Sequence, residues 1–274
     1  MAREISQYPR DANIGNPEGT NKVFKEYENI HKGKKAVFVA GGPSLDKFIP
    51  LENVIYTGVN LIGKHRLFDQ SVPGSIKLDY YFFGDRDRHM PKDFEVTRQK
   101  FGGCIFYGKE FPSLLLTKKE VESLGGKPFE QNIEHGKGEW EGRGTRRNNF
   151  DRHTKGHWIK RQPNPLLPSH GIFRDISQNP CYGHTICIPA VQFLIYTGVS
   201  VIYLVGADCS GQTSFGVDAK SPVSSSNRVA HLNYVDGFKH WINFKMFLRE
   251  EKINVKIISI NPVGLRGYFE EIYY

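Results

Sequence analysis

The feature that most constrains this chain is a series of short, continuous apolar runs that each end at glycine or a polar residue. β-Branched and aromatic residues are frequent in these runs, which cover residues 36–40, 53–59, 78–83, 103–107, 199–205 and 256–260. Continuous apolar strands are typical of parallel sheets covered on both faces. Helical spacing at residues 185–196 and 232–251 separates the later runs. We therefore expect an α/β fold with a Rossmann-like, mostly parallel sheet and helices on both faces.

The length and the loss of pattern in the middle predict one domain with an insertion. The 274 residues suit one large α/β domain over residues 34–274. Residues 1–33 are polar and turn-rich, so we expect a lead-in with a short helix near residues 22–31. Periodicity is lost over about residues 117–180, which predicts an inserted lid.

The second half of this insertion is strongly basic. Residues 143–161 contain aromatic side chains among Arg143, Arg146, Arg147, Arg152, Lys155, Lys160 and Arg161. Three uses stay open: a lid that closes over an anionic donor, nucleic-acid binding through phosphate contacts and stacking, or a solvated loop. The formal net charge of +8 also favours an anionic partner, although an ordinary basic surface would give the same sum.

Cysteine usage and hydropathy indicate a cytoplasmic protein. Four cysteines, at positions 104, 181, 187 and 209, fit neither a zinc site nor a dense disulfide framework. No long apolar run predicts a transmembrane segment, and the N-terminus lacks the apolar core of a signal peptide. Aromatic residues near the C-terminus could form a homo-oligomer interface or pack on the core: Tyr268, Phe269, Tyr273 and Tyr274.

A glycine-rich turn follows the first apolar run. Gly41, Gly42, Pro43 and Ser44 can present backbone N–H groups to an anion, and we expect Ser44 to cap a helix that begins near Leu45. The turn matches neither the dinucleotide-binding fingerprint nor the Walker loop, and it could be a plain strand-to-helix connection. Ligands of parallel sheets bind beyond the carboxyl ends of strands, which favours phosphate binding here.

Polar residues follow the other runs as well. Asn60, Asp85, Asp208 and Asn261 each come directly or shortly after a predicted strand. Asp85 and Asp87 could hold Mg²⁺ or Mn²⁺ on a diphosphate. They could instead pair with the neighbouring arginines, and a polar contact of Asp85 with substrate is the favoured interpretation. Together these residues predict one pocket at the carboxyl edge.

Two histidines are candidates for proton transfer or binding. His231 opens the long predicted helix after a serine-rich loop, where a neutral imidazole could deprotonate a hydroxyl. His184 stands beside Thr185 at a predicted helix start, where the helix dipole would lower its pKa. The chain has ten histidines, so position alone selects neither.

These features together resemble the bacterial sialyltransferases with a single Rossmann-like domain, a variant of the GT-A architecture. They also resemble the motility-associated-factor and hydroxymethylpterin-diphosphokinase-like proteins. The resemblance depends on three segments: "VFVAGGPSLDKF", "GVSVIYLVGAD" and the helix–strand unit that begins "AHLNYVDGFKHW". It covers roughly residues 34–90 and 180–263 and leaves the middle of the chain unmatched.

The resemblance implies roles for individual positions. The turn at residues 41–44 would contact the donor nucleotide and its phosphate, and Asn60 the donor phosphate or sugar. Asp85 stands where the sialyltransferases use an asparagine for the nucleotide, and His184 and Thr185 would also hold it. Asp208 would lie in the same donor pocket, and His231 would be the general base.

Two departures leave the donor sugar open. The sialyltransferase turn has an asparagine between its glycines, and that family uses two tyrosines after the Gly-x-Asp strand to stabilise the leaving phosphate. This chain has "AGGPS" and "CSGQTSFGVD" instead. Cationic residues of the basic segment, or a metal at Asp85 and Asp87, could take over that task.

We therefore predict a glycosyltransferase that moves a sugar from a nucleotide-sugar donor to an acceptor hydroxyl, with His231 and Asp85 as catalytic candidates. The acceptor would be a glycan, a lipid-linked glycan or a modified nucleic acid. Alternatives are a viral-type DNA-modifying glycosyltransferase, an ATP- and Mg²⁺-dependent diphosphokinase-like phosphotransferase, and a non-enzymatic binding module.

Overall fold

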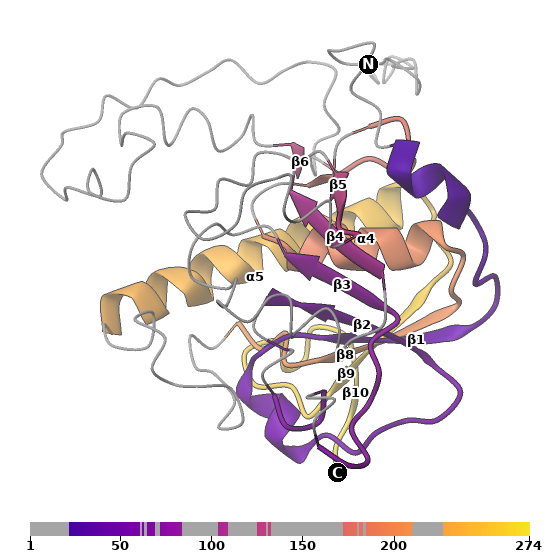
Figure 1. Cartoon of the computed structure of the whole chain (residues 1–274). Helices are drawn as coiled ribbons and strands as arrows, with labels where there is room; N and C mark the ends of the chain where they lie inside the picture. The colour runs from indigo at the N-terminus through magenta and orange to yellow at the C-terminus, as the bar shows by residue number, and fades with distance from the viewer. Residues whose placement is uncertain are drawn as a thin grey trace, which may run out of the picture.

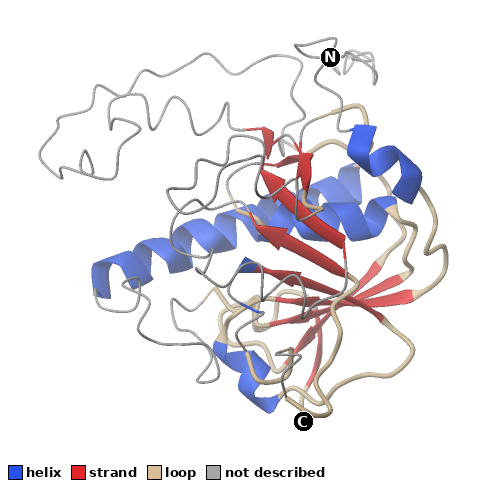
Figure 2. Cartoon of the chain, viewed as in Figure 1, coloured by secondary structure: helices blue, strands red, loops and turns tan. Residues whose placement is uncertain are grey.

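The computed structural model describes residues 22–60, 62, 65–68, 72–83, 104–108, 125–129, 131–132, 172–179, 181–182, 185–209 and 227–274, with only the backbone of residues 227–236 (Figure 2). The basic segment 143–161 and the candidates Asp85, Asp87 and His184 lie outside the described residues.

Eight parallel strands form one sheet in the order β10-β9-β8-β1-β2-β3-β4-β5 (Figure 1). Their bounds are β1 (Lys35–Val39), β2 (Ile55–Val59), β3 (Tyr80–Phe83), β4 (Cys104–Gly108), β5 (Lys127–Phe129), β8 (Val201–Val205), β9 (Lys256–Ile260) and β10 (Glu270–Ile272). The predicted parallel α/β sheet is confirmed. A separate two-stranded sheet pairs β6 (Gln131–Asn132) with β7 (Cys181–Tyr182).

The strand order reverses between β1 and β8. From β1 the chain adds strands in one direction as far as β5, and then returns to place β8, β9 and β10 on the other side of β1. β8 pairs with β1 in a register that matches Lys35 with Val201 and Val39 with Val205. In open parallel sheets such a reversal point is the usual place for a ligand crevice.

Alternate residues of the strands face two hydrophobic cores. Phe38 and Phe82 face the first core, which is covered by α4 (Cys187–Tyr196), α5 (Asn227–Glu250) and the 3₁₀-helix η1 (Lys22–Tyr27). Val37 and Tyr81 face the second core. In the described part of the chain, the 3₁₀-helix η2 (Pro43–Lys47) and irregular segments cover this second face, so both α-helices lie on one side of the sheet (Figure 1).

A cluster of aromatic rings fills the first core. The Phe193 ring of α4 lies 4.8 Å from that of Tyr80, 5.1 Å from that of Phe106 and 5.4 Å from that of Phe24, measured between centroids. Such offset and edge-to-face pairs add to the free energy of apolar burial. Helix α4 is therefore fixed against β3 and β4, and its N-terminal end lies at the carboxyl edge of the sheet.

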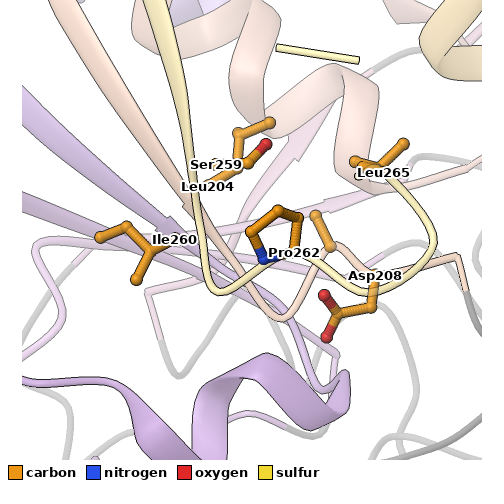
Figure 3. Close-up of a pocket in the computed structure, with 7 residues that line it drawn as sticks. Leu204, Asp208, Ser259, Ile260, Pro262 and Leu265 are labelled. Atoms are coloured by element: carbon orange, nitrogen blue, oxygen red, sulfur yellow. The ribbon is translucent and has the colours of Figure 1, made fainter. Parts of the chain in front are cut away.

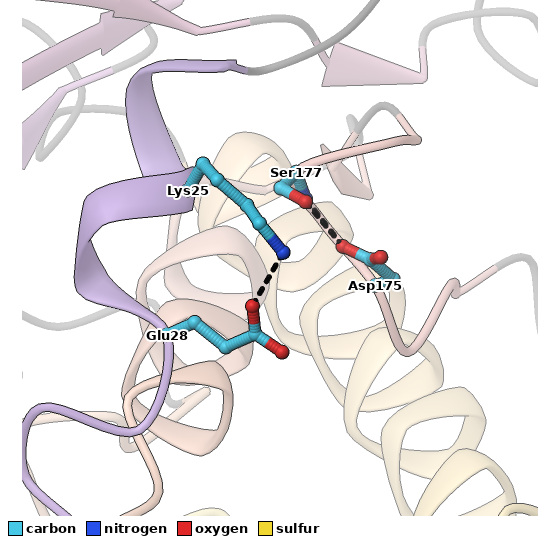
Figure 4. Close-up of polar contacts among 4 residues, drawn as sticks. All are labelled: Lys25, Glu28, Asp175 and Ser177. Atoms are coloured by element: carbon cyan, nitrogen blue, oxygen red, sulfur yellow. Dashed lines mark hydrogen bonds and ion pairs between the residues drawn. The ribbon is translucent and has the colours of Figure 1, made fainter.

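Local polar contacts hold the segments around η1 and α4 (Figure 4). Lys25 Nζ donates to Glu28 Oε2 at 2.6 Å, and the Ser177 hydroxyl donates to Asp175 Oδ1 at 2.7 Å. The side chain of Gln192, buried in α4, donates to the Phe173 carbonyl at 2.5 Å. The segment 172–179 is thus anchored on α4.

Several element bounds differ from the sequence predictions. Helix α5 begins at Asn227 rather than near residue 232, because its polar first turn carries no apolar period. Strand β5 extends the main sheet within the segment predicted as an insertion. Tyr268 and Phe269 pack on the first core, whereas Tyr273 and Tyr274 are exposed beside the unpredicted strand β10. Within the described part of the chain, no helix is both long and apolar enough to span a membrane.

Candidate active site at the carboxyl edge of the sheet

Hydrogen bonds close the reversal point between β1 and β8. Ala40 N donates to the Val205 carbonyl at 2.8 Å, and Gly42 N donates to the Gly206 carbonyl at 2.8 Å. Gly206 N in turn donates to Ser44 Oγ at 2.7 Å. The crevice expected at this point is therefore filled by the protein's own backbone and by one buried hydroxyl.

Glycine is required on both sides of this closure. Gly206 has a φ of +69°, and a Cβ there would lie 1.8 Å from the Ala40 carbonyl oxygen. A Cβ on Gly42 would lie 2.5 Å from both Asp208 Oδ2 and the Gly206 carbonyl oxygen. Only a residue without a side chain lets the two turns approach this closely.

Asp208 is buried at the centre of the closure. Its side chain is 4% exposed; Oδ2 accepts from Ser44 N at 2.7 Å and Oδ1 from Val263 N at 3.2 Å. Burial raises the pKa of Asp208, and the hydrogen bonds from Ser44 and Val263 oppose that shift. Both carboxylate oxygens are thus already bonded to protein N–H groups.

The glycine-rich turn differs from the predicted phosphate cradle. The N–H groups of Gly42 and Ser44 are bonded within the protein, and Pro43 has none. Gly41 is the one residue of the turn whose N–H makes no hydrogen bond among the described residues. The prediction that Ser44 caps a following α-helix is wrong, since Ser44 lies inside η2, a single 3₁₀ turn that begins at Pro43 with Gly42 as its cap.

Asn60 follows β2 with an unusual backbone and an unsatisfied side chain. Its φ is +52°, and its Oδ1 atom is buried without a hydrogen-bond partner among the described residues. Asparagine tolerates the left-handed region better than most residues. A buried amide oxygen without a partner costs free energy, which a hydrogen-bond donor on a ligand would recover.

His65 was not singled out by its sequence, yet it is buried at the same edge. It is 1% exposed; Nδ1 accepts from Leu67 N at 3.2 Å, and Nε2 lies 3.9 Å from Asp46 Oδ1. Burial lowers the pKa of His65, and the nearby Asp46 carboxylate opposes this shift only in part. The ring is therefore a neutral acceptor at Nδ1 that fixes the turn after Asn60.

Thr185 lies at the start of α4, where its Oγ1 accepts from Cys187 N at 3.4 Å. The helix N-terminus faces the carboxyl edge because α4 runs antiparallel to the strands before β8. Thr185 therefore fits the predicted place near the site, but its hydroxyl already serves the first helical turn.

The backbone of α5 brings His231 to the carboxyl side. A Cβ on Gly237 would lie 3.3 Å from Cys209 Sγ, which places Gly237 beside the segment that follows β8. His231 precedes Gly237 by six residues on the same helix. At a rise of about 1.5 Å per residue, position 231 lies about 9 Å from Gly237 along the helix axis. The backbone of position 231 thus lies toward the carboxyl side of the sheet, and its role as a base stays a prediction.

No described cluster of His, Cys, Asp or Glu side chains has three members that could together hold a metal ion. A small hollow lies at the ends of β8 and β9, between Leu204, Asp208, Ser259 and Leu265 (Figure 3). It has no room for a water-sized molecule. Ligand pockets usually hold roughly 300–1,000 Å³, so this hollow is too small for a nucleotide sugar.

Comparisons with known proteins return two kinds of glycosyltransferase as structural neighbours. The sialyltransferase CstII from Campylobacter jejuni, in complex with the substrate analogue CMP-3FNeuAc, shares 15% identity over 87% of this chain and 86% of its own, with a TM-score of 0.42. The MAf glycosyltransferase from Magnetospirillum magneticum AMB-1 shares 10% identity over 96% of this chain, with a TM-score of 0.42. This chain spans 39% of the MAf protein.

Both protein groups that the sequence motifs resemble thus occur among the structural neighbours. A CMP complex of the Y81F form of Cst-II matches with 15% identity and a TM-score of 0.38. No family model matches the sequence, and no curated protein matches it either. At these identities and TM-scores, the neighbours do not assign the chain to a family.

Proposed function

We propose that this protein is a glycosyltransferase that moves a sugar from a nucleotide-sugar donor to an acceptor hydroxyl. The observation that supports the proposal most strongly is that candidate residues from different elements lie at the same edge of the sheet. Asn60, whose buried Oδ1 has no partner among the described residues, follows β2 at the edge toward which the start of α5, with His231, also points, and this supports the proposal. The order of these residues along the chain also matches the sialyltransferase motifs.

The donor would bind over the ends of β1 and β2. Asn60 would offer its amide to the donor, and the N–H of Gly41, which makes no hydrogen bond to a described residue, would face the phosphate. The N-terminus of α4, with His184 and Thr185, would complete the nucleotide site because a helix start favours anions. Gly42, Ser44 and Asp208 would hold this edge in shape rather than touch the donor.

The proposed chemistry is a direct displacement. His231 removes the proton from the acceptor hydroxyl as general base, and the acceptor oxygen attacks the anomeric carbon. The bond from that carbon to the nucleotide phosphate breaks, and the phosphate leaves with the bonding electrons. Cationic residues of the basic segment, or a divalent metal held by Asp85 and Asp87, would stabilise the charge on the leaving phosphate.

A binding screen followed by a base substitution tests this function. We expect at least one nucleotide sugar from a panel to raise the melting temperature more than its nucleoside monophosphate does. With that donor, His231→Ala should lower kcat by about 10²–10⁴-fold, the usual contribution of a general base. His240→Ala, nine residues further along the same helix, serves as the matched control and should retain turnover.

Two results would contradict the proposal. If no nucleotide sugar shifts the melting temperature, the enzyme class is wrong. If His231→Ala keeps full turnover with intact donor binding, another group is the base. A parallel measurement in EDTA distinguishes a metal-assisted leaving group, since only that arrangement loses turnover when the metal is removed.

A further inference from the structure

We infer that Asp208 is a positioning residue, whose carboxylate joins the turn after β1, the end of β8 and the loop after β9 into one block. This block fixes the position of the proposed donor site, at the ends of β1 and β2, relative to α5. The inference rests on the proposed function for what is being positioned, whereas the block itself is a property of the free protein.

Donors from distant parts of the chain meet at this one residue. Ser44 N, which binds Oδ2, is 164 residues away in sequence, and Val263 N, which binds Oδ1, is 55 residues away. The carbonyl oxygen of Asp208 accepts from Gly264 N at 2.8 Å. Two loops from opposite sides of β8 are thus fixed to a single carboxylate and its backbone.

Ser44 completes the arrangement as a reciprocal partner. Its hydroxyl oxygen accepts from Gly206 N at 2.7 Å, and its backbone N–H donates to Asp208 Oδ2 at 2.7 Å. Ser44 is 3% exposed and Asp208 4%, so water does not compete for these bonds. Buried networks in which each member is satisfied are stiff, and they lose several bonds when one member is removed.

The block extends to α5 through the residue after Asp208. Cys209 has a φ of +48°, and its Sγ would lie 3.3 Å from a Cβ on Gly237. Helix α5 therefore packs directly on the side chain of Cys209, the residue that follows Asp208. A shift of residues 208–209 would displace α5 and the backbone of His231 relative to Asn60.

The same geometry argues against a direct ligand role for Asp208. Each oxygen of this carboxylate already accepts a backbone N–H and is buried, so a metal ion or a ribose hydroxyl could reach it only if the surrounding turns opened. An amide cannot take the place of the carboxylate, because its NH₂ group would face one of the two N–H donors. The site needs two acceptor oxygens.

A double-mutant cycle on the free protein tests the block without any substrate. Asp208→Asn and Ser44→Ala should each lower the free energy of unfolding in urea. The double variant should be close to the worse single variant, with a coupling of about tenfold, or about 1.4 kcal/mol. If the losses in the free energy of unfolding of the two single variants simply add in the double variant, the inference is wrong.

If Asp208→Asn does not fold, hydrogen exchange on Ser44→Ala tests the inference instead. Ser44→Ala alone removes the acceptor of Gly206 N and loosens the turn whose backbone N–H binds Asp208, so the amide of Val263 should exchange faster, although Ser44 itself does not contact it. Unchanged protection of Val263 in this variant would refute a shared block.

Kinetics with the accepted donor distinguish positioning from donor contact. Asp208→Asn should lower kcat at least tenfold while the KM for the donor stays within about threefold. Phe24→Leu, in the aromatic core, serves as a control for lost stability alone and should leave kcat unchanged. A raised donor KM with normal kcat would make Asp208 a contact residue. Failure of the proposed function would not alter the cycle or the exchange result.

Discussion

Replacing Gly206 by alanine should separate the two turns that close the reversal point of the sheet. The new methyl group would lie 1.8 Å from the Ala40 carbonyl oxygen and 3.0 Å from Gly42 N. A carbon–oxygen contact needs about 3.3 Å, so the turns would have to move apart by about 1.5 Å. The 2.8 Å bonds from Ala40 N and Gly42 N cannot survive that movement.

The expected loss can be estimated from these terms. A left-handed alanine costs about 1–2 kcal/mol, and each of the two lost hydrogen bonds costs about 1 kcal/mol. Gly206→Ala should therefore lower the free energy of unfolding by about 3–4 kcal/mol. Gly33→Ala is the matched control, because Gly33 has a φ of +77° but no atom within 4 Å of the place that a methyl group would occupy. Gly33→Ala should lower the free energy of unfolding only by the cost of a left-handed alanine.

Urea unfolding followed by circular dichroism measures both variants against the parent protein. The difference between the two losses isolates the steric closure from the backbone conformation. If Gly206→Ala is no less stable than Gly33→Ala, the contact between the two turns does not stabilise the fold as described.

Two further predictions concern buried polar side chains. Burial lowers the pKa of His65 in the native protein below its ordinary value of 6.5. The unfolded chain therefore binds this proton more tightly than the native protein does. The stability that neutral His65 contributes is complete above pH 6.5 and is lost as the pH falls through the lowered pKa. His65→Asn, which keeps an acceptor for Leu67 N, should flatten the acid limb of stability against pH, and an unchanged limb would contradict this. Thr57 is fully buried and its hydroxyl has no partner among the described residues, so Thr57→Val should stabilise by about 1 kcal/mol in urea. Thr197→Val should destabilise by a similar amount, because the buried Thr197 hydroxyl donates to Leu194 O at 2.7 Å; equal effects of the two changes would refute the distinction.

The strands were predictable where burial alone decides them. Residues 36–40 and 256–260 are continuous apolar runs, and β1 and β9 lie there with bounds that differ by at most one residue. Strand β10 could not be predicted in this way, because Glu270 and Glu271 give no apolar run and the pairing depends on β9. The same holds for β5, whose three residues are too few for a periodic signal.

The candidate site was predictable in place but not in detail. Parallel strands put Asn60, Asp208 and the turn after β1 on one edge, as the sequence indicated. The bonds between Ser44 and Asp208 join residues 164 apart, and no local pattern specifies which side chain will satisfy which amide. His65 carried no signal for the same reason: its burial and its bond to Leu67 arise only in the folded chain.

The reversal of strand order also has a consequence for how the chain folds. Strand β1 pairs on one side with β2, close in sequence, and on the other with β8, where Lys35 meets Val201. Contacts of such long sequence separation slow folding, because the loop between them must be closed before they form. During synthesis, β1 must therefore keep an unpaired apolar edge until β8 has emerged. We expect that half-made chain to be the species most prone to aggregation and most dependent on chaperones.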